Sequence, residues 1–253
     1  MLATALCRPT TEFPMPQLTT YELDGSIATI TMDDGKANAL SSAMLDSLGA
    51  ALDRAEADGA VVILTGRPGR FSAGFDLKTF MTGLEPSVKM LKSGGEFALR
   101  LLAFPRPVVI ACSGHAVAGG TFPLLAADAR IGVDGPFQIG MSEVAIGMTM
   151  PYFAIELVRS RLTKNAADRT LVTAQLFSPR EAVAAGYLDQ VVDPDQLREA
   201  SVQEATRLAA LNPGAHLATK LRVREATIAA LHAAAQRELD SEGIAALGIV
   251  PAG

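Results

Sequence analysis

The first part of the chain alternates apolar and smaller or polar residues in the manner of β-strands. This alternation runs through residues 19–23 and 27–32, and the turn-forming pair Asp24-Gly25 lies between them. Residues 60–65 form a continuous apolar run flanked by glycines, which is typical of a strand covered on both faces. The pattern therefore predicts a hairpin and a buried strand.

Apolar residues at helical spacing lie between these strands and beyond them. Met44, Leu48 and Leu52 fall on one face of a helix predicted over residues 41–57. A second helix is predicted over residues 86–102, and residues 108–112 form another apolar run. This order of strands and helices predicts an α/β domain with right-handed crossovers, in which ligands bind at the carboxyl ends of the strands.

After residue 177 the pattern becomes mostly helical. Residues 178–181, Ser-Pro-Arg-Glu, combine a capping box with proline at the first helical position, and Gly186 ends that helix. Asp193-Pro194 starts another helix, and alanine-rich amphipathic sequence follows. We predict a disordered leader at residues 1–17, an α/β core at residues 18–195 and a C-terminal helical region at residues 196–253.

Composition excludes several classes of partner. The net charge is −5 and the pI is near 5.3, and no basic block suits nucleic acid or an anionic membrane surface. Two cysteines are too few for a disulfide framework, and three scattered histidines offer no metal-binding spacing. No window reaches the roughly 18 apolar residues of a membrane span, and the first residues do not resemble a signal peptide. We expect a cytoplasmic protein that binds a small soluble ligand.

Two small-residue loops follow predicted strands. Residues 114–121 nearly match a phosphate-binding loop, but Gly120 stands where that motif requires lysine. Residues 67–76 carry a second small-residue pair, Ala73-Gly74. Both segments are compatible with ordinary turns. Alternatively, each loop directs one backbone N–H group at a common point, where the pair would stabilise a developing negative charge.

Glu143 lies in an otherwise uncharged segment, residues 140–147. One interpretation is a glutamate that pairs with an arginine or reaches solvent. The other is a general base, because apolar surroundings raise a carboxyl pKa toward neutrality, which suits proton abstraction from carbon. The segment alone leaves both interpretations open.

Together these segments resemble the crotonase (enoyl-CoA hydratase/isomerase) superfamily. The resemblance covers residues 18–239 and depends on residues 34–41, 70–78, 114–120 and 140–147, with a later match at residues 176–189. It implies a spiral of ββα units, C-terminal helices that form a homotrimer or a hexamer of two trimers, and an acyl-CoA thioester as ligand. Coenzyme A is then part of the substrate, and no further cofactor or metal is expected.

The resemblance also implies roles for individual residues. The backbone N–H groups of Ala73 and Gly119 would hold the thioester oxygen, and Glu143 would be the catalytic base. The substrate-binding residues implied beside them are Lys36, Ala37, Phe71, Ser72, Gly74, Phe75, Asp76, Leu77, Gly120 and Phe122. We expect His115 to hold its loop in place through a hydrogen bond.

Position 122 departs from the pattern of the family's hydratases. These enzymes carry two glutamates that hold the attacking water; the second matches Glu143, but the first position is Phe122. The family's Δ3,Δ2-enoyl-CoA isomerases use one glutamate, which moves a proton from C2 to C4. We therefore expect an enoyl-CoA isomerase, in which Phe122 excludes water.

Several alternatives stay open at this point. Phe122 could be simple core packing, with no bearing on catalysis. The protein could be a hydratase, an enzyme of thioester hydrolysis or carbon–carbon cleavage, or an acyl-CoA-binding protein without activity. A non-catalytic protein would have no use for Glu143.

Overall fold

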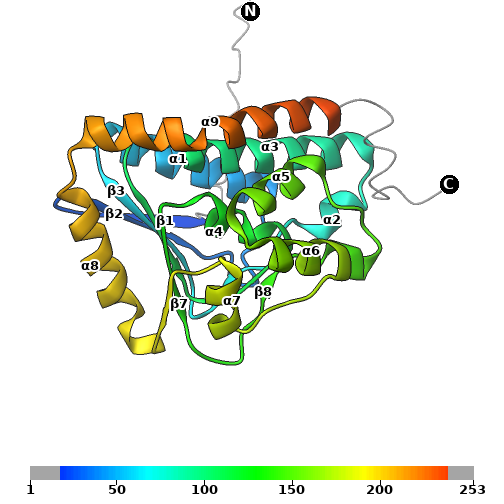
Figure 1. Cartoon of the computed structure of the whole chain (residues 1–253), viewed down its shortest axis with the longest axis horizontal. Helices are drawn as coiled ribbons and strands as arrows, with labels where there is room; N and C mark the ends of the chain where they lie inside the picture. The colour runs from blue at the N-terminus through cyan, green and yellow to red at the C-terminus, as the bar shows by residue number, and fades with distance from the viewer. Residues whose placement is uncertain (1–17, 239–253) are drawn as a thin grey trace, which may run out of the picture.

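The computed structural model describes residues 18–238, so the predicted leader and the last residues of the predicted C-terminal region lie outside the described residues. Within this range, two parallel or mostly parallel sheets are surrounded by helices (Figure 1). No helix in this range is long and apolar enough to cross a membrane.

The larger sheet has six strands in the order β1-β2-β3-β5-β7-β9. β1 and β2 form the predicted antiparallel hairpin, and the remaining neighbours are parallel. The strands are β1 (Thr19–Asp24), β2 (Ile27–Met32), β3 (Val61–Gly66), β5 (Val108–Cys112), β7 (Ala129–Val133) and β9 (Gln190–Val192). Every residue of β5 and β7 is buried, as the continuous apolar run of β5 predicts.

A smaller, parallel sheet has the order β4-β6-β8. Its strands are β4 (Gly69–Ser72), β6 (Gly114–Val117) and β8 (Ile139–Gly140). The chain passes from the larger to the smaller sheet three times, through β3–β4, β5–β6 and β7–β8, and each passage leads to a helix. The structure therefore has the expected spiral of ββα units. The sequence pattern predicted loops in place of β4 and β6, and that prediction is wrong.

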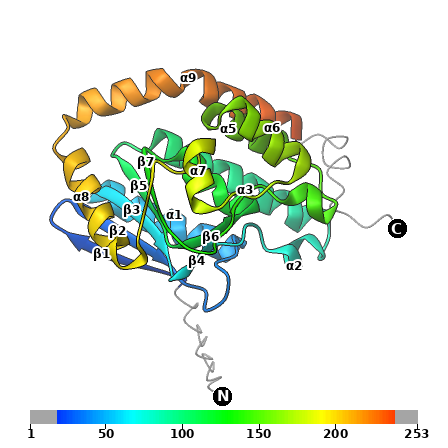
Figure 2. The same ribbon diagram turned by 60° about the horizontal axis from the view of Figure 1, so that its bottom comes forward.

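Helices cover both faces of the larger sheet (Figure 2). One core lies between this sheet, the smaller sheet and the helices of the spiral. The second core lies between β3, β5 and β7 on one side and α8 on the other. The helices are α1 (Ser42–Ala57), α2 (Leu77–Phe80), α3 (Leu84–Ala103), α4 (Phe122–Ala126), α5 (Tyr152–Arg161), α6 (Lys164–Thr173), α7 (Pro179–Ala185), α8 (Leu197–Ala209) and α9 (Pro213–Glu238).

Local sequence explains where several helices begin. The Ser41 hydroxyl accepts from the Met44 amide at the start of α1. Ser178 and Glu181 form the predicted capping box of α7, and Gly186 ends that helix with a left-handed φ of 104°. These caps confirm the helix boundaries expected from sequence to within one residue.

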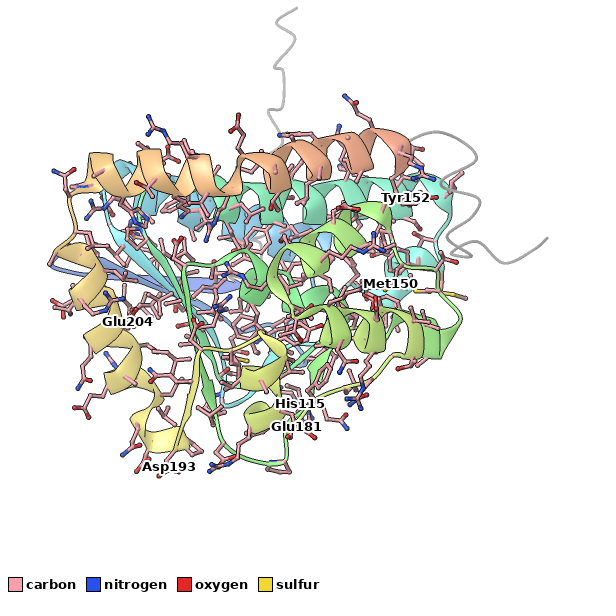
Figure 3. The ribbon with its side chains drawn as sticks, viewed as in Figure 1. His115, Met150, Tyr152, Glu181, Asp193 and Glu204 are labelled. Carbon is pink, nitrogen blue, oxygen red and sulfur yellow. The ribbon has the colours of Figure 1, made fainter. Side chains whose placement is uncertain are left out.

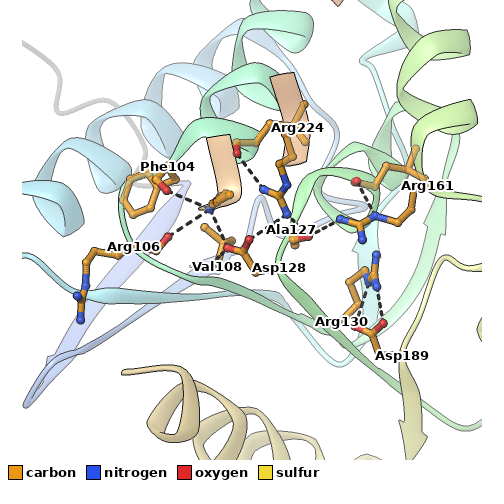
Figure 4. Close-up of polar contacts among 12 residues, drawn as sticks. Phe104, Arg106, Val108, Ala127, Asp128, Arg130, Arg161, Asp189 and Arg224 are labelled. Carbon is orange, nitrogen blue, oxygen red and sulfur yellow. Dashed lines mark hydrogen bonds and ion pairs between the residues drawn. The ribbon is translucent and has the colours of Figure 1, made fainter. Parts of the chain in front are cut away.

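Buried ion pairs fix α9 to the core (Figure 4). The Asp128 carboxylate lies 2.8 Å from Lys220 Nζ and 2.9 Å from Arg224 Nη2, and it also accepts from the Val108 amide at 2.8 Å. The Lys220 side chain is 2% exposed, and burial lowers its pKa to about 8 although Asp128 opposes this shift. This carboxylate joins the start of β5 to α9, where Lys220 lies 92 residues after Asp128 in the sequence.

Candidate active site

Three segments that are distant in sequence meet beside the smaller sheet. They are the loop at residues 34–40, the end of β4 with residues 73–76, and the turn that follows β6. β4 pairs with β6, and Leu40 forms a parallel bridge with Phe75. The two small-residue loops noted in the sequence are therefore neighbours in space.

Asn38 holds the first segment in place. Its φ is 52°, a left-handed conformation that asparagine tolerates better than most residues. Its buried side-chain amide donates to the carbonyl oxygens of Met32, Arg70 and Phe71 at 3.0, 3.1 and 3.2 Å. The Asn38 carbonyl accepts from the Ser72 hydroxyl at 2.7 Å. One side chain thus ties the loop at residues 34–40 to β4.

The amides after β4 show which N–H groups are available to a ligand. The Ala73 N–H donates to the Ala37 carbonyl at 2.9 Å, and the Gly74 N–H donates to Ser72 Oγ at 3.2 Å. The next amide, Phe75 N–H, donates to no acceptor within residues 18–238. The structure therefore does not support the expectation that the Ala73 N–H holds the thioester oxygen, because this N–H already donates to Ala37. The Phe75 N–H is the donor of this loop that has no acceptor among the described residues.

The turn after β6 brings Gly119 next to this donor. Ala118 has a φ of 52°, and Gly119 follows it near the start of a short 3-10 helix (Ala118–Thr121), where N–H groups have no acceptor within the helix. Gly74 has a φ of +85°, and a Cβ on it would lie 3.0 Å from Gly119 N and 2.8 Å from Ala118 Cβ. A Cβ on Gly120 would lie 2.5 Å from Ser72 O. Glycine is required here because the two loops touch.

A row of aromatic rings lines this meeting point. Phe75 packs edge-on against Phe122 with centroids 5.7 Å apart, and Phe122 packs against Phe153 at 5.5 Å. Phe122 is 1% exposed. A Cβ on Gly94 of α3 would lie 2.3 Å from Phe75 Cζ, so this glycine makes room for the ring. Position 122 is thus an apolar wall of the site as well as part of the core.

Glu143 stands beside the glycine turn. β6 pairs with β8 in the register Val117 to Gly140, so the residues after β8 run next to those after β6. Glu143 starts a 3-10 helix (Glu143–Ile146), is 6% exposed and forms no salt bridge with any described residue. The Ser142 amide donates to its Oε2 at 2.9 Å. The first of the two interpretations, pairing with an arginine or contact with solvent, is therefore wrong.

Burial dominates the electrostatics of Glu143. It raises the pKa of this carboxyl above its usual value of 4.5, and the amides of Glu143 and Ser142 offset part of the increase. Burial also raises the pKa of Tyr187, and the charge of Glu143 acts in the same direction. The Tyr187 hydroxyl lies 3.3 Å from Thr170 Oγ1, which accepts from the Met141 amide at 2.9 Å. These contacts fix the strand end that presents Glu143.

A cavity of about 250 Å³ opens beside these loops. Ala37 of the loop at residues 34–40 and Ser72 and Ala73 at the end of β4 line one part of it. The rest of the lining comes from β4, β6 and the segments around β8 and before α7: Arg70, His115, Val117, Gln138, Ser142 and Leu176. His115 Nδ1 accepts from the Gln138 amide at 3.1 Å, which confirms the expected structural hydrogen bond. Figure 3 labels His115 in the lower half of the molecule.

The sequence model of the enoyl-CoA hydratase/isomerase family matches residues 22–246. The chain belongs to this family. It is 32% identical over 220 residues to human enoyl-CoA delta isomerase 1, a mitochondrial protein, covering 85% of this chain and 72% of the relative. A solved enoyl-CoA isomerase from Mycobacterium tuberculosis has 42% identity and a TM-score of 0.85, covering 92% of this chain and 99% of that one.

Hydratases of the family are similar to the same degree. The structure of an enoyl-CoA hydratase from Mycobacterium ulcerans has 40% identity and a TM-score of 0.84, covering 90% of this chain and 98% of that one. The protein is therefore an enzyme of the crotonase type with the crotonase fold. Overall sequence and structural similarity does not distinguish isomerisation from hydration.

The residues expected at the site fall into three groups. The structure brings together Gly74, Phe75, Gly119, Gly120 and Phe122 at the contact between the loops. Ala37, Ser72 and Ala73 line the adjoining cavity. Lys36 is exposed, Phe71 is fully buried in β4, Asp76 accepts from the Lys78 amide at the start of α2, and Leu77 is 54% exposed.

No second carboxylate joins Glu143 at this point among the described residues. Asp76 is bonded to Lys78 N and Thr79 Oγ1 at the start of α2. Asp128 is bonded to Lys220 and Arg224. The sequence did not identify Asn38, Thr170 or Tyr187 as residues of the site. The Asn38 position was within a recognised motif, but Thr170 gives no signal in the sequence.

Proposed function

We propose that this family member is an enoyl-CoA isomerase that converts a 3-enoyl-CoA thioester into the 2-enoyl-CoA thioester. The observation that carries the proposal is the combination of a buried Glu143, which has no salt bridge to any residue that the structure describes, with a buried Phe122 beside the same pair of loops. Names of relatives support both this reaction and hydration. The residue at position 122 favours isomerisation.

Two backbone amides would stabilise the reacting thioester. We assign the donors to Phe75 and Gly119, since the Ala73 amide is bonded to Ala37. They would bind the thioester oxygen, whose negative charge grows as the C2 proton leaves. Donors directed at that position stabilise the transition state more than the substrate. Removing one such donor typically costs about 3 kcal/mol of transition-state stabilisation.

Glu143 would move one proton between two carbons. Its carboxylate takes a proton from C2, and the electrons of the broken C–H bond enter the π system of a dienolate. The protonated carboxyl then returns the proton to C4, so that the double bond lies between C2 and C3. The raised pKa of Glu143 brings the carboxyl closer to the pH at which a base of this kind is effective.

Phe122 would keep water out of this exchange. In a two-glutamate hydratase the residue at this position helps to hold the attacking water. A phenyl ring offers no hydrogen bond, and its 1% exposure leaves little space for a solvent molecule. The dienolate would therefore be protonated by Glu143 and not trapped by hydration.

Two substrates test the proposal. Purified protein is incubated with trans-3-hexenoyl-CoA and, separately, with crotonyl-CoA, and the absorbance of the conjugated thioester is followed. We expect the absorbance to rise with the first substrate and to remain constant with the second. Glu143→Gln should abolish the rise, whereas Glu225→Gln, at an exposed glutamate on α9, should retain it. Loss of crotonyl-CoA absorbance would contradict the proposal.

Hydration is the second candidate, because the hydratase from M. ulcerans is 40% identical to this chain. It would require water to be held by Glu143 together with backbone groups, without a second carboxylate. The crotonyl-CoA arm of the same experiment measures this activity directly.

A further inference from the structure

One buried hydroxyl group of α6 holds the segment that carries Glu143. Met141 lies two residues before Glu143, and its N–H donates to Thr170 Oγ1 at 2.9 Å. Thr170 is 1% exposed and belongs to α6, which Figure 1 shows beside α7 and β8. The position of the chain just before the proposed base therefore depends on a side chain 29 residues further along than Met141.

Met141 also contacts the turn that presents Gly119. Its Sδ lies 3.0 Å from Thr121 Oγ1, and the same hydroxyl donates to the Ala118 carbonyl oxygen at 2.9 Å. Ala118 and Thr121 are the two ends of the short 3-10 helix that contains Gly119. Met141 is fully buried, so both of its contacts lie inside the core. One residue thus joins the turn of a proposed oxyanion donor to the segment of the proposed base.

The surroundings of Thr170 fix the direction of its hydroxyl. The hydroxyl of Tyr187, which is fully buried, lies 3.3 Å from Thr170 Oγ1. The Met141 amide lowers the pKa of Tyr187 against the larger, opposite effect of burial, so this amide faces both hydroxyls. A Cβ on Gly140 would lie 3.1 Å from Thr170 Oγ1, so β8 packs directly against this oxygen. Thr170 Oγ1 is therefore held in place as the acceptor for the Met141 amide.

We propose that Thr170 is a positioning residue, which acts through Met141 on the Glu143 carboxylate. Its hydroxyl keeps this carboxylate at a fixed place relative to the thioester oxygen bound at Gly119. The proposal rests on the proposed function, because it assumes that Glu143 is the base. One carboxyl can serve two carbons only if it reaches both while the oxygen is held, and a displacement of about 1 Å can lower the rate about 10²-fold.

Three variants on α6 test the proposal. Thr170→Val keeps the size of the side chain but removes the acceptor of the Met141 amide, whereas Thr170→Ser keeps that acceptor. Thr173→Val makes the same change at an exposed threonine of the same helix, whose hydroxyl donates to the Arg169 carbonyl oxygen. Thermal unfolding of the three proteins checks that they fold.

Turnover and binding are measured separately with the full chain. With trans-3-hexenoyl-CoA, Thr170→Val should lower kcat at least about fivefold, because it displaces the base. The Kd for butanoyl-CoA, measured by isothermal titration calorimetry, should not change, since loss of kcat without loss of binding is typical of an interaction that acts only in the transition state. Thr170→Ser should restore kcat, and Thr173→Val should equal wild type.

A general structural defect gives a different result. It would weaken butanoyl-CoA binding together with kcat, and serine at position 170 would not restore turnover. Either of these results, or a smaller loss of kcat in Thr170→Val, would overturn the proposal. If Thr170→Val does not fold, Tyr187→Phe decides the question, because it removes the hydroxyl that fixes Thr170 Oγ1. It should lower kcat at unchanged Kd, and a kcat equal to that of wild type would overturn the proposal.

The outcomes separate this proposal from the proposed function. If crotonyl-CoA is hydrated, the same variants are measured with that substrate, because hydration also needs the base and the bound oxygen. A loss of kcat in Thr170→Val would then support the positioning role although the enzyme is not an isomerase. Isomerisation that Thr170→Val leaves unchanged would overturn the positioning role alone. Absence of turnover with both substrates would overturn both.

Discussion

Two buried carboxylates in this protein have opposite surroundings. Asp128 lies between Lys220 and Arg224 and accepts a backbone hydrogen bond, so its charge is compensated where α9 meets the core. Glu143 is buried to a similar degree but forms no salt bridge with a described residue, and burial raises its pKa. A compensated charge holds elements together, whereas an uncompensated carboxylate is available to accept a proton.

The largest expected effect is on catalysis by the uncompensated carboxylate. Glu143→Gln keeps the shape of the side chain but removes the base, and loss of general base catalysis typically lowers turnover about 10²–10⁴-fold. Thioester binding, measured by calorimetry with butanoyl-CoA, should change little. Turnover of trans-3-hexenoyl-CoA within threefold of wild type would show that Glu143 is not the base.

The largest expected effect on stability is at the compensated carboxylate. Asp128→Asn leaves Lys220 and Arg224 without their anion in a buried position, and breaking such a pair typically costs about 3–5 kcal/mol of unfolding free energy. Urea denaturation measures this loss. The control is Asp53→Asn, because the Asp53 side chain is 74% exposed and its ion pair with Arg100 is at the surface. Equal losses of unfolding free energy for the two substitutions would contradict the claim that the buried ion pairs of Asp128 stabilise the fold more than the surface ion pair of Asp53.

A smaller effect is expected where the two small-residue loops, residues 67–76 and 114–121, touch. Gly74→Ala forces a Cβ into a position 2.8 Å from Ala118 Cβ at a φ of +85°. The strained backbone should cost about 1–3 kcal/mol of unfolding free energy. Displacement of the Phe75 and Gly119 amides should lower kcat for the 3-enoyl thioester. Gly49→Ala is the control, because a Cβ on that glycine meets nothing within 4 Å.

The smallest effect concerns pH. A raised folded-state pKa means that the folded protein binds the Glu143 proton more tightly than the unfolded chain does. This contribution to stability is fully present below the ordinary carboxyl pKa and is lost as the pH rises through the folded-state value. Glu143→Gln should therefore be at least as stable as wild type at pH 7. Its stability relative to that of wild type should be lower at pH 4 than at pH 7. Thermal unfolding at both values measures the difference, and a variant less stable at pH 7 would contradict the sign.

The sequence predicted those features that local patterns determine. The hairpin, strand β5, helix α1 and the α7 capping box follow from alternation, apolar runs and caps, and the structure confirms them. The smaller sheet was missed because β4 and β8 are only 4 and 2 residues long and lack alternating patterns. Short strands of this kind are fixed by pairing with distant segments.

The candidate site shows the same limit at the level of single atoms. Motifs located the loops and Glu143, but they did not show that the Ala73 amide is bonded to Ala37. They also did not show that the Phe75 amide has no acceptor in the described part of the chain. Nor did they show that Lys220 and Arg224 compensate Asp128, because that contact joins residues 92 and 96 positions apart. Hydrogen-bond direction and long-range pairing depend on the folded backbone.

The central claim is that one buried carboxylate transfers a proton between two carbons without water. It is tested most directly with 3-hexenoyl-CoA carrying two deuterium atoms at C2, with the 2-hexenoyl-CoA product analysed by mass spectrometry and NMR at early times. We predict that a measurable fraction of the product carries deuterium at C4. Product with hydrogen from solvent alone at C4, or 3-hydroxyhexanoyl-CoA as the main product, would contradict the claim.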